Sequence, residues 1–456
     1  MEENNSFKPY VSADKVLPEF TVSSILIGII LAIVFGAANA YLGLRVGMTV
    51  SASIPAAVIG MGVYKLIGGF SSKKEETILE SNMVQTIGSA GESLAAGAIF
   101  TMPVLFLWAA EKKAQMPSIV EIALIAMIGG LLGICFMVPL RKALIVKEHG
   151  TLPYPEGTAC AEVLLAGQEG GANAAIVFIG MGISALAKFI VDGLKVVSNV
   201  VTIPIQKIHT EVSAEVYPAL ISVGYICGFK IASYMFAGAI LGWLVMIPAI
   251  YLFGANTILY PATVTIAEVW KSGGASGIWS NYIRYIGAGA VAAGGIISLV
   301  KSLPLICRTF VDALRGMMNK EAIGKEERTN RDMNMGLVLG MLAVLIILIA
   351  VLPVIPIGVL GAIIIVIFGF FFAAVSSRMV GLVGSSNNPV SGMAIATLLI
   401  TSLILKATGN SGASGMVAAI AIGSVICIIA AIAGDTSQDL KTGYLLGATP
   451  KKQQIG

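Results

Sequence analysis

Three carboxylates that interrupt apolar stretches are the residues of this sequence best suited to chemistry. Glu92 lies in GSAGESLAAG, and Glu156 and Glu162 follow Tyr154 in LPYPEGTACAEVLLAG. Ionisable side chains in such surroundings are expensive and usually face a cavity or a partner. We therefore predict that Glu92, Glu156 and Glu162 exchange protons, and that Tyr154, Glu156 and Glu162 contact a substrate. The alternatives are a helix-start carboxylate at an interface for Glu92, and a loop leading into an amphipathic helix for the others.

Four more polar residues join this predicted site. Asn387 and Asn388 precede a proline in NNP, and their amides can bind peptide groups, although the same residues also suit a helix start. Asp435 and Asp439 open the polar stretch DTSQDLKTGYLLGATP, for which a solvated loop is the alternative. We predict that all four contact the substrate.

Other kinds of chemistry find little support in the sequence. The two histidines have no ligand partner at a metal-binding spacing, and neither a GxSxG nor a GxxxxGK[ST] motif is present. We predict no metal, no cofactor and no enzymatic activity, and we interpret the five scattered cysteines as reduced packing residues. Lys188 and Asp192, four residues apart, are expected to neutralise each other on one helix.

The elements that position these residues must be membrane helices. Hydrophobic residues make up 57% of the 456 residues and charged residues 12%, which predicts an all-α polytopic membrane protein. A crossing needs ~20 mostly apolar residues. This criterion predicts about twelve crossings, near 21–42, 48–66, 84–108, 119–140, 173–194, 215–230, 233–253, 282–300, 336–353, 357–376, 389–405 and 415–433.

Two polar segments, 151–168 and 435–450, are predicted to be re-entrant. Pro153 and Pro155 disfavour regular helix, so a helix capped by Thr158 is expected to start near residue 158. The two segments have similar patterns, as do 85–97 and 382–394, so we predict an internal repeat lined by broken segments 82–93, 151–168, 385–390 and 435–450. The GxxxG spacings Gly43/Gly47, Gly129/Gly133 and Gly336/Gly340 fit close helix packing.

Charge distribution predicts how the protein is organised and oriented. Lysines and arginines concentrate in loops, above all in 301–331, which favours membrane orientation over nucleic-acid binding. We predict a cytoplasmic N-terminal tail (1–20), a first transmembrane repeat region (21–300), a basic cytoplasmic loop (301–335) and a second transmembrane repeat region (336–456). The protein is expected in the cell (plasma or inner) membrane, with its N-terminus cytoplasmic.

Four long motifs make the sequence similar to a known family. NAYLGLRVGMTVSASIPAAV (39–58), NMVQTIGSAGESLAAGAIFTMP (82–103), LPYPEGTACAEVLLAG (152–167) and GDTSQDLKTGYLLGATPKKQQIG (434–456) resemble the bacterial branch of the oligopeptide transporter (OPT) family, related to yellow-stripe-like transporters. The resemblance implies a proton-coupled importer of small peptides or of metal complexes with peptide-like chelators. Family members usually continue beyond the last motif, so we expect the sequence to be truncated at its C-terminus and the second repeat region to be incomplete.

These observations together predict a secondary active transporter, with proton-coupled uptake of small oligopeptides as the leading function. The alternatives are transport of metal-chelate (siderophore- or nicotianamine-like) complexes, an intramembrane enzyme using paired carboxylates or Cys160, and a passive channel. The predicted partners are peptides or metal-peptide chelates, protons and the lipid bilayer. A homo-oligomer or a separate C-terminal part is also left open.

Overall fold

The computed structural model describes residues 7–46, 49, 51–68, 77–169, 172–198, 200–215, 218–287, 289–290, 293–294, 297, 300, 304, 327–352, 356–388 and 390–456. The protein divides into two compact units, Met1–Ala175 with Gly295–Gly456, and Ile176–Gly294. We call them the first and the second unit. The first unit holds every residue of the predicted site.

The first unit is built from helices. They are α1 (Val22–Val46), α2 (Ser53–Gly68), α3 (Ile78–Ile99), α4 (Pro103–Ala110), α5 (Ile119–Arg141), α6 (Pro155–Glu169), α12 (Met335–Val351), α13 (Gly358–Val383), α14 (Val390–Ala407), α15 (Ala413–Leu446) and α16 (Pro450–Ile455). A π-helical stretch, Lys142–Lys147, extends α5.

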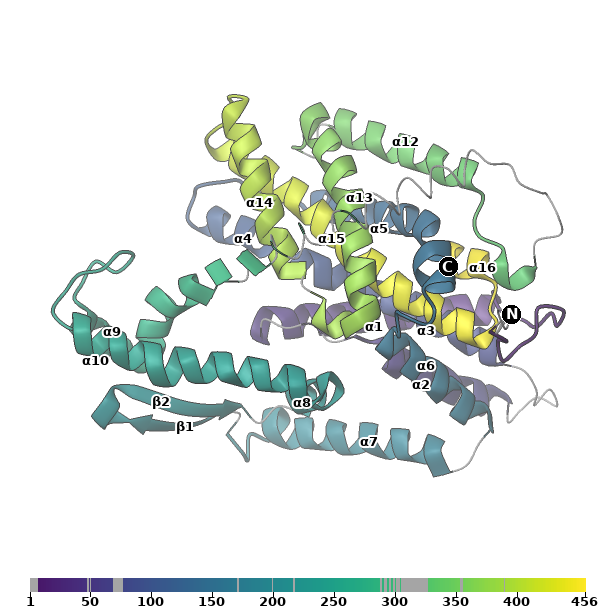
Figure 1. Ribbon diagram of the computed structural model, residues 1–456, viewed down its shortest axis with the longest axis horizontal. Coiled ribbons are helices and arrows are strands. Elements are labelled where there is room, and N and C mark those ends of the chain that lie inside the picture. Colours follow the sequence, from purple (N-terminus) through teal and green to yellow (C-terminus); the bar gives the residue numbers. More distant parts are fainter. Residues whose placement is uncertain are drawn as a thin grey trace. The chain divides into compact units, whose positions relative to one another are not determined.

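Helix α15 is the centre of this unit. Helix α15, yellow in Figure 1, packs against α3, α5, α13 and α14. Most of its residues are buried. Two glycines of α5 bring that helix close to α15: a Cβ on Gly129 would lie 2.9 Å from the Cβ of Ile428, and one on Gly133 would lie 3.0 Å from the Cβ of Ile432. This confirms helix packing for one of the three GxxxG pairs.

The other GxxxG pairs have different outcomes. Gly43 packs against the side chain of Ile99, whereas its partner Gly47 lies outside the described residues. A Cβ on Gly340 would meet no atom of the described structure within 4 Å, and one on Gly336 would meet only Asn334. The spacing in α12 therefore does not mark a helix contact within the described residues.

The second unit contains most of α7 (Ala172–Lys188), α8 (Pro218–Ile240), α9 (Ile247–Gly254), α10 (Ile266–Ile278), and an antiparallel hairpin of β1 (Val200–Ile205) and β2 (Thr210–Glu215). π-Helical stretches follow α7, α8 and α10 at Phe189–Gly193, Leu241–Met246 and Trp279–Ile283. The predicted pair of Lys188 and Asp192 is confirmed as an ion pair. The hairpin was not predicted, although its β-branched residues favour strands.

The membrane helices agree in part with the predicted crossings. Six described helical segments are long and apolar enough to span a membrane: Val22–Leu44, Ile119–Lys147, Ala232–Gly254, Arg328–Val351, Gly358–Val383 and Ala413–Leu446. A seventh arises if α3 and α4, bent by 42° at their junction, form one broken span. The described part is thus consistent with an all-α polytopic membrane protein. Twelve crossings, the domain boundaries and the repeat remain predictions, and much of 282–300 lies outside the described residues.

Two predicted helix breaks are wrong. The crossing 415–433 and the re-entrant segment 435–450 are largely one 34-residue helix, α15, about 51 Å long at 1.5 Å per residue. Its polar residues find partners on neighbouring helices, so the helix does not need to break. It ends at Leu446 because Gly447 is left-handed, with φ 82°. The predicted crossings 215–230 and 233–253 also join, through α8, a π-helical stretch and α9.

The two remaining predicted breaks in the first half of the sequence were placed incorrectly. Residues 82–93 lie within continuous α3. The break at 151–168 ends at Tyr154, where φ is +47°, and α6 begins at Pro155 rather than near residue 158. Proline is well tolerated at the first helical position because it needs no hydrogen-bond acceptor there. Thr158 donates its hydroxyl to the Pro153 carbonyl oxygen at 2.7 Å instead of capping the helix.

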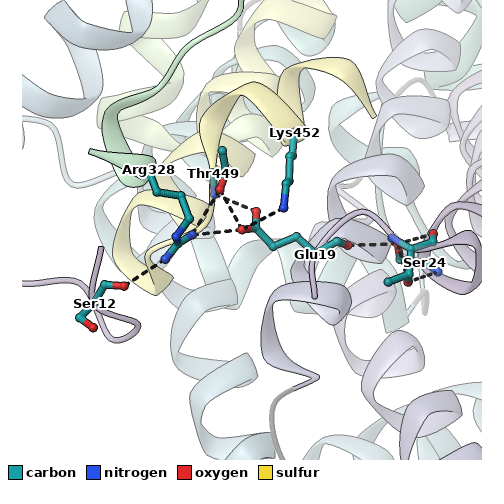
Figure 2. Close-up of polar contacts among 7 residues, drawn as sticks. Ser12, Glu19, Ser24, Arg328, Thr449 and Lys452 are labelled. Atoms are coloured by element: carbon teal, nitrogen blue, oxygen red, sulfur yellow. Dashed lines mark hydrogen bonds and ion pairs between the residues drawn. The ribbon is translucent and has the colours of Figure 1, made fainter. Parts of the chain in front are cut away.

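The N-terminal tail is bound to the far end of α15. The backbone nitrogens of Tyr10 and Val11 donate to the carbonyl oxygens of Leu445 and Leu446, at 3.1 and 3.0 Å. The Glu19 carboxylate then accepts from Arg328 and Thr449, as Figure 2 shows. Residues at both ends of the sequence therefore anchor one end of the central helix.

Candidate functional site

Two polar stripes lie on packed helices of the first unit. Spacings of three and four residues place side chains on one face of a helix, and α3 packs against α15. The stripe on α3 consists of Gln85, Ser89, Glu92 and Ser93, and the stripe on α15 consists of Asp435, Gln438, Asp439 and Thr442. Hydrogen bonds join these stripes to each other and to α2 and α6.

Asp439 is the best-satisfied carboxylate of the site. It is 3% exposed, and its Oδ2 accepts from the Ser89 hydroxyl at 2.5 Å. Its Oδ1 accepts from the Ser53 hydroxyl at 3.2 Å and from the Gln85 side-chain amide. These donors come from α2 and α3, so Asp439 ties three helices together.

Glu92 and Asp435 lie in the same region. Glu92 is 3% exposed, and it accepts from Asn39 Nδ2 at 2.9 Å and from the Ala52 backbone nitrogen at 3.2 Å. Asp435 accepts from the Ser93 hydroxyl, one residue beyond Glu92. Neither carboxylate is at a solvated interface or in a solvated loop.

Glu156 occupies the first turn of α6. The left-handed backbone at Tyr154 is fixed by a hydrogen bond from its nitrogen to the Gly381 carbonyl oxygen at 2.8 Å. One Glu156 oxygen, Oε1, accepts from the Ser386 backbone nitrogen at 3.0 Å, and the other, Oε2, is buried without a partner among the described residues. The helix dipole favours a negative charge at this position.

The four carboxylates form one electrostatic group, and no cationic side chain in the described part of the chain is paired with them. Each is at most 7% exposed, and the charge of Glu92 interacts with those of Asp435, Glu156 and Asp439. Among the described residues no lysine, arginine or histidine forms an ion pair with any of them. Ionised carboxylates are very costly to bury unpaired, so this arrangement favours binding protons or a cationic group.

The described residues contain no group of three or more histidine, cysteine, aspartate or glutamate side chains that could hold a metal ion. The carboxylates instead accept from separate hydroxyl and amide groups.

Lys441 is a buried cation on another face of α15. It is 1% exposed, and its Nζ lies 2.7 Å from His149 Nδ1 and 3.3 Å from the Leu152 carbonyl oxygen. The rings of Tyr444 and His149 make an edge-to-face contact, with 5.3 Å between their centroids. Burial and the charge of Lys441 lower the pKa of His149, so the neutral imidazole is favoured.

The structure brings together some of the predicted site residues and not others. Four of them converge as described: Glu92, Glu156, Asp435 and Asp439. Asn388 lies beside α15, since a Cβ on Gly434 would be only 2.8 Å from Asn388 Nδ2. Two others do not join this group: Tyr154 is buried with its ring 5.5 Å from Lys441 Nζ, and Glu162 is exposed on α6. The Asn387 side chain lies outside the described residues.

Sequence reasoning missed the neutral partners of the carboxylates. Ser53, Gln85, Ser89, Ser93 and Asn39 supply most of their hydrogen bonds. The signal that could have identified the α3 residues is their spacing of three and four within an apolar helix. Nothing local distinguishes Ser53 or Asn39, whose partners lie on other helices.

Comparison with known proteins gives the family to which this sequence belongs. A protein of Haemophilus influenzae, provisionally named an oligopeptide transporter, is 33% identical over 443 residues, which cover 91% of this chain and 66% of that protein. The chain thus spans slightly less than two thirds of that relative's length. The family model described as OPT oligopeptide transporter protein matches residues 19–456. The match extends over all four motifs and the four buried carboxylates, and the chain therefore belongs to the oligopeptide transporter (OPT) family.

Proposed function

We propose that this protein performs proton-coupled transport of small oligopeptides across a cell membrane. The family supports the transport of oligopeptides. The observation that carries the proton coupling is the group of four buried carboxylates without an ion pair among the described residues. The family is one of transporters, so the prediction that the protein is not an enzyme is confirmed at the level of the family.

The physical basis of the coupling is the cost of burying charge. A carboxylate closed off from water is stable only when protonated or bound to a cation, whereas the same group in contact with water ionises readily. A conformational change that alternately buries and exposes Glu92, Glu156, Asp435 or Asp439 would therefore bind and release protons. Ligands shift such an equilibrium by binding one conformation more tightly than the other.

The proposed cargo is a peptide rather than a metal chelate, although both present carboxylates and amines. The Ser, Gln and Asn side chains that donate to the carboxylates in this structure are also of the kind that hydrogen-bonds to peptide groups. A chelate would bring its own metal ligands and would need no metal-binding cluster in the protein. Transport assays should include both.

Basic residues support a cytoplasmic N-terminus. Arg328 binds Glu19 of the N-terminal tail, Arg141 binds Asp332 at 2.5 Å, and the backbone nitrogen of Lys451 donates to the Arg331 carbonyl oxygen. Cationic residues near the ends of membrane helices favour the cytoplasmic side. We propose that this end of the first unit faces the cytoplasm of the cell, whose plasma or inner membrane holds the protein.

Uptake into proteoliposomes tests the function. With an inward proton gradient, we expect saturable uptake of mixed di- to pentapeptides that collapses when the gradient is dissipated, and weaker uptake of a ferric chelate assayed in parallel. The Haemophilus influenzae relative, reconstituted in the same way, is the comparison protein. Uptake that ignores the gradient would contradict proton coupling, and uptake of the chelate alone would contradict the proposed cargo.

Two matched substitutions locate the coupling. Glu92→Gln removes the charge of a buried carboxylate, so we expect the pH dependence of uptake to weaken. Glu162→Gln makes the same change on an exposed position of α6, and we expect it to transport like the wild type. Unchanged pH dependence in Glu92→Gln would exclude Glu92 from the coupling, and its loss in Glu162→Gln would restore the role that the sequence suggested.

A further inference from the structure

Two buried oxygen atoms beside one turn lack hydrogen-bond donors. The turn Gly384–Asn388 follows α13 and precedes α14. Glu156 binds the turn through Oε1, but its Oε2 has no partner among the described residues, and Glu156 is only 5% exposed. Asn388 donates from Nδ2 to the Ser376 hydroxyl at 2.8 Å, which leaves its Oδ1 buried and without a partner in the same part of the structure described.

Both of these atoms are acceptors, so the missing group is a donor. Because Asn388 donates from Nδ2, the atom of its amide left without a hydrogen bond is the oxygen, which can only accept. The ionised carboxylate oxygen of Glu156 likewise only accepts. Buried polar atoms without a partner are rare in folded proteins, and each one needs an explanation. A bound ligand that donates hydrogen bonds would satisfy both atoms.

The surrounding charge favours a cationic donor. Glu156 interacts electrostatically with Glu92 and with Asp435. Lys441 faces His149 and the Leu152 carbonyl oxygen, and it forms no ion pair with a described carboxylate. Because the described residues hold no metal-binding cluster, a cation that recognises its site through N–H donors fits better than a metal ion.

We propose that Glu156 and Asn388 bind the primary ammonium group at the N-terminus of a peptide. This inference rests on the proposed transport of peptides and specifies which end of the peptide is recognised. A primary ammonium carries three N–H donors. These donors match the acceptor chemistry of Glu156 Oε2 and Asn388 Oδ1, and the charge of the ammonium offsets the excess of carboxylates.

Both unpartnered oxygen atoms are buried in this structure, so binding of an ammonium group to them requires the turn to move. The turn starts at Gly384, whose φ of +87° suits glycine, and a Cβ there would lie 2.9 Å from Glu156 Oε1.

Binding of three related tripeptides to the purified chain of 456 residues in detergent tests the proposal. The probes are trialanine, N-acetyl-trialanine and trialanine amide, measured by isothermal titration calorimetry. We expect trialanine and its amide to bind alike and the N-acetylated peptide to bind at least tenfold more weakly, as for loss of a charge-assisted hydrogen bond. In Glu156→Gln the three peptides should differ by less than about twofold, whereas Glu111→Gln, an exposed control, should retain the wild-type preference.

The outcomes separate this inference from the proposed function. Equal binding of acetylated and free peptides by the wild type, or full discrimination in Glu156→Gln, would overturn the ammonium site while leaving peptide binding intact. Binding of no peptide by the folded wild type would instead refute both. If Glu156→Gln does not fold, Asn388→Ala takes its place with the same expected loss. Competition by NaCl but not by ethylammonium chloride would assign the site to a metal cation and overturn the proposal.

Discussion

Replacing Glu19 with alanine should strongly destabilise the first unit. The Glu19 side chain is fully buried, and its carboxylate pairs with Arg328 Nη1 at 3.1 Å. It also accepts hydrogen bonds from the backbone nitrogen and the hydroxyl of Thr449, at 2.9 and 2.8 Å. Lys452 lies 3.5 Å away. Figure 2 shows these groups converging on the carboxylate, with Ser12 contacting Arg328 on the opposite side.

The expected size of the loss follows from the burial of each partner. Removing one partner of a buried ion pair costs about 3–5 kcal/mol because the other charge stays buried and unpaired. The Arg328 side chain is 13% exposed, so it falls in this class. Lys452 is 38% exposed and should add at most about 1 kcal/mol. We therefore expect Glu19→Ala to lower the free energy of unfolding by about 4 kcal/mol. Glu19→Gln keeps one acceptor oxygen and should lower it by about 2 kcal/mol.

Thermal unfolding in detergent, together with limited proteolysis of the N-terminal tail, measures this effect. Glu19→Ala should melt well below the wild type and expose the tail to protease. The control is Glu111→Ala, which removes an exposed ion pair with Lys113 and should cost less than about 1 kcal/mol. If Glu19→Ala is no less stable than Glu111→Ala, the reasoning from burial is refuted.

Three more predictions concern other parts of the first unit. Gly97→Val would place a Cβ 2.5 Å from the Cα of Ile428, so we expect α3 and α15 to be forced apart at a cost of about 3 kcal/mol, seen as a lower melting temperature. Asp439→Asn places an amide NH₂ among three hydrogen-bond donors and should lower the free energy of unfolding by about 2 kcal/mol. If the variant melts at the temperature of the wild type, these hydrogen bonds contribute little to stability. Because the pKa of His149 is lowered by burial and by Lys441, the fold binds fewer protons there than the unfolded state, and stability falls as the pH drops below about 6.5. The melting temperature of the wild type should therefore fall more than that of His149→Gln between about pH 7.5 and pH 5, and parallel falls would contradict the role of His149.

Part of the site could be predicted because burial of charge has a clear signature in sequence. Glu92, Glu156 and Asp435 were identified as polar groups interrupting apolar stretches, and the structure buries all three. Glu162 shared that signature with Glu156 but has the opposite outcome, since it is exposed. The position of a residue around the helix axis decides whether its side chain faces the protein. Because the start of α6 was predicted near residue 158 instead of at Pro155, the sequence did not distinguish Glu156 from Glu162.

The continuity of α15 could not be predicted from local composition. Its polar residues from Asp435 to Thr442 predict a break or a loop when they are considered alone. They remain helical because partners such as Ser89 and Gly157 lie on other helices, where Thr442 donates to the Gly157 carbonyl oxygen at 2.8 Å. Polar residues inside a helix need no solvent when neighbouring elements satisfy them.

The sequence by itself determined the class of protein, the family and the presence of costly carboxylates at membrane depth. Those properties depend on composition and on motifs that are contiguous in the sequence. The tertiary structure alone decided which hydroxyl or amide meets each carboxylate and which oxygens are left without donors. Ser89 and Asp439 are 350 residues apart in sequence and form a hydrogen bond. Such pairs follow from the packing of whole helices, because polar groups acquire their partners only when distant elements are brought together.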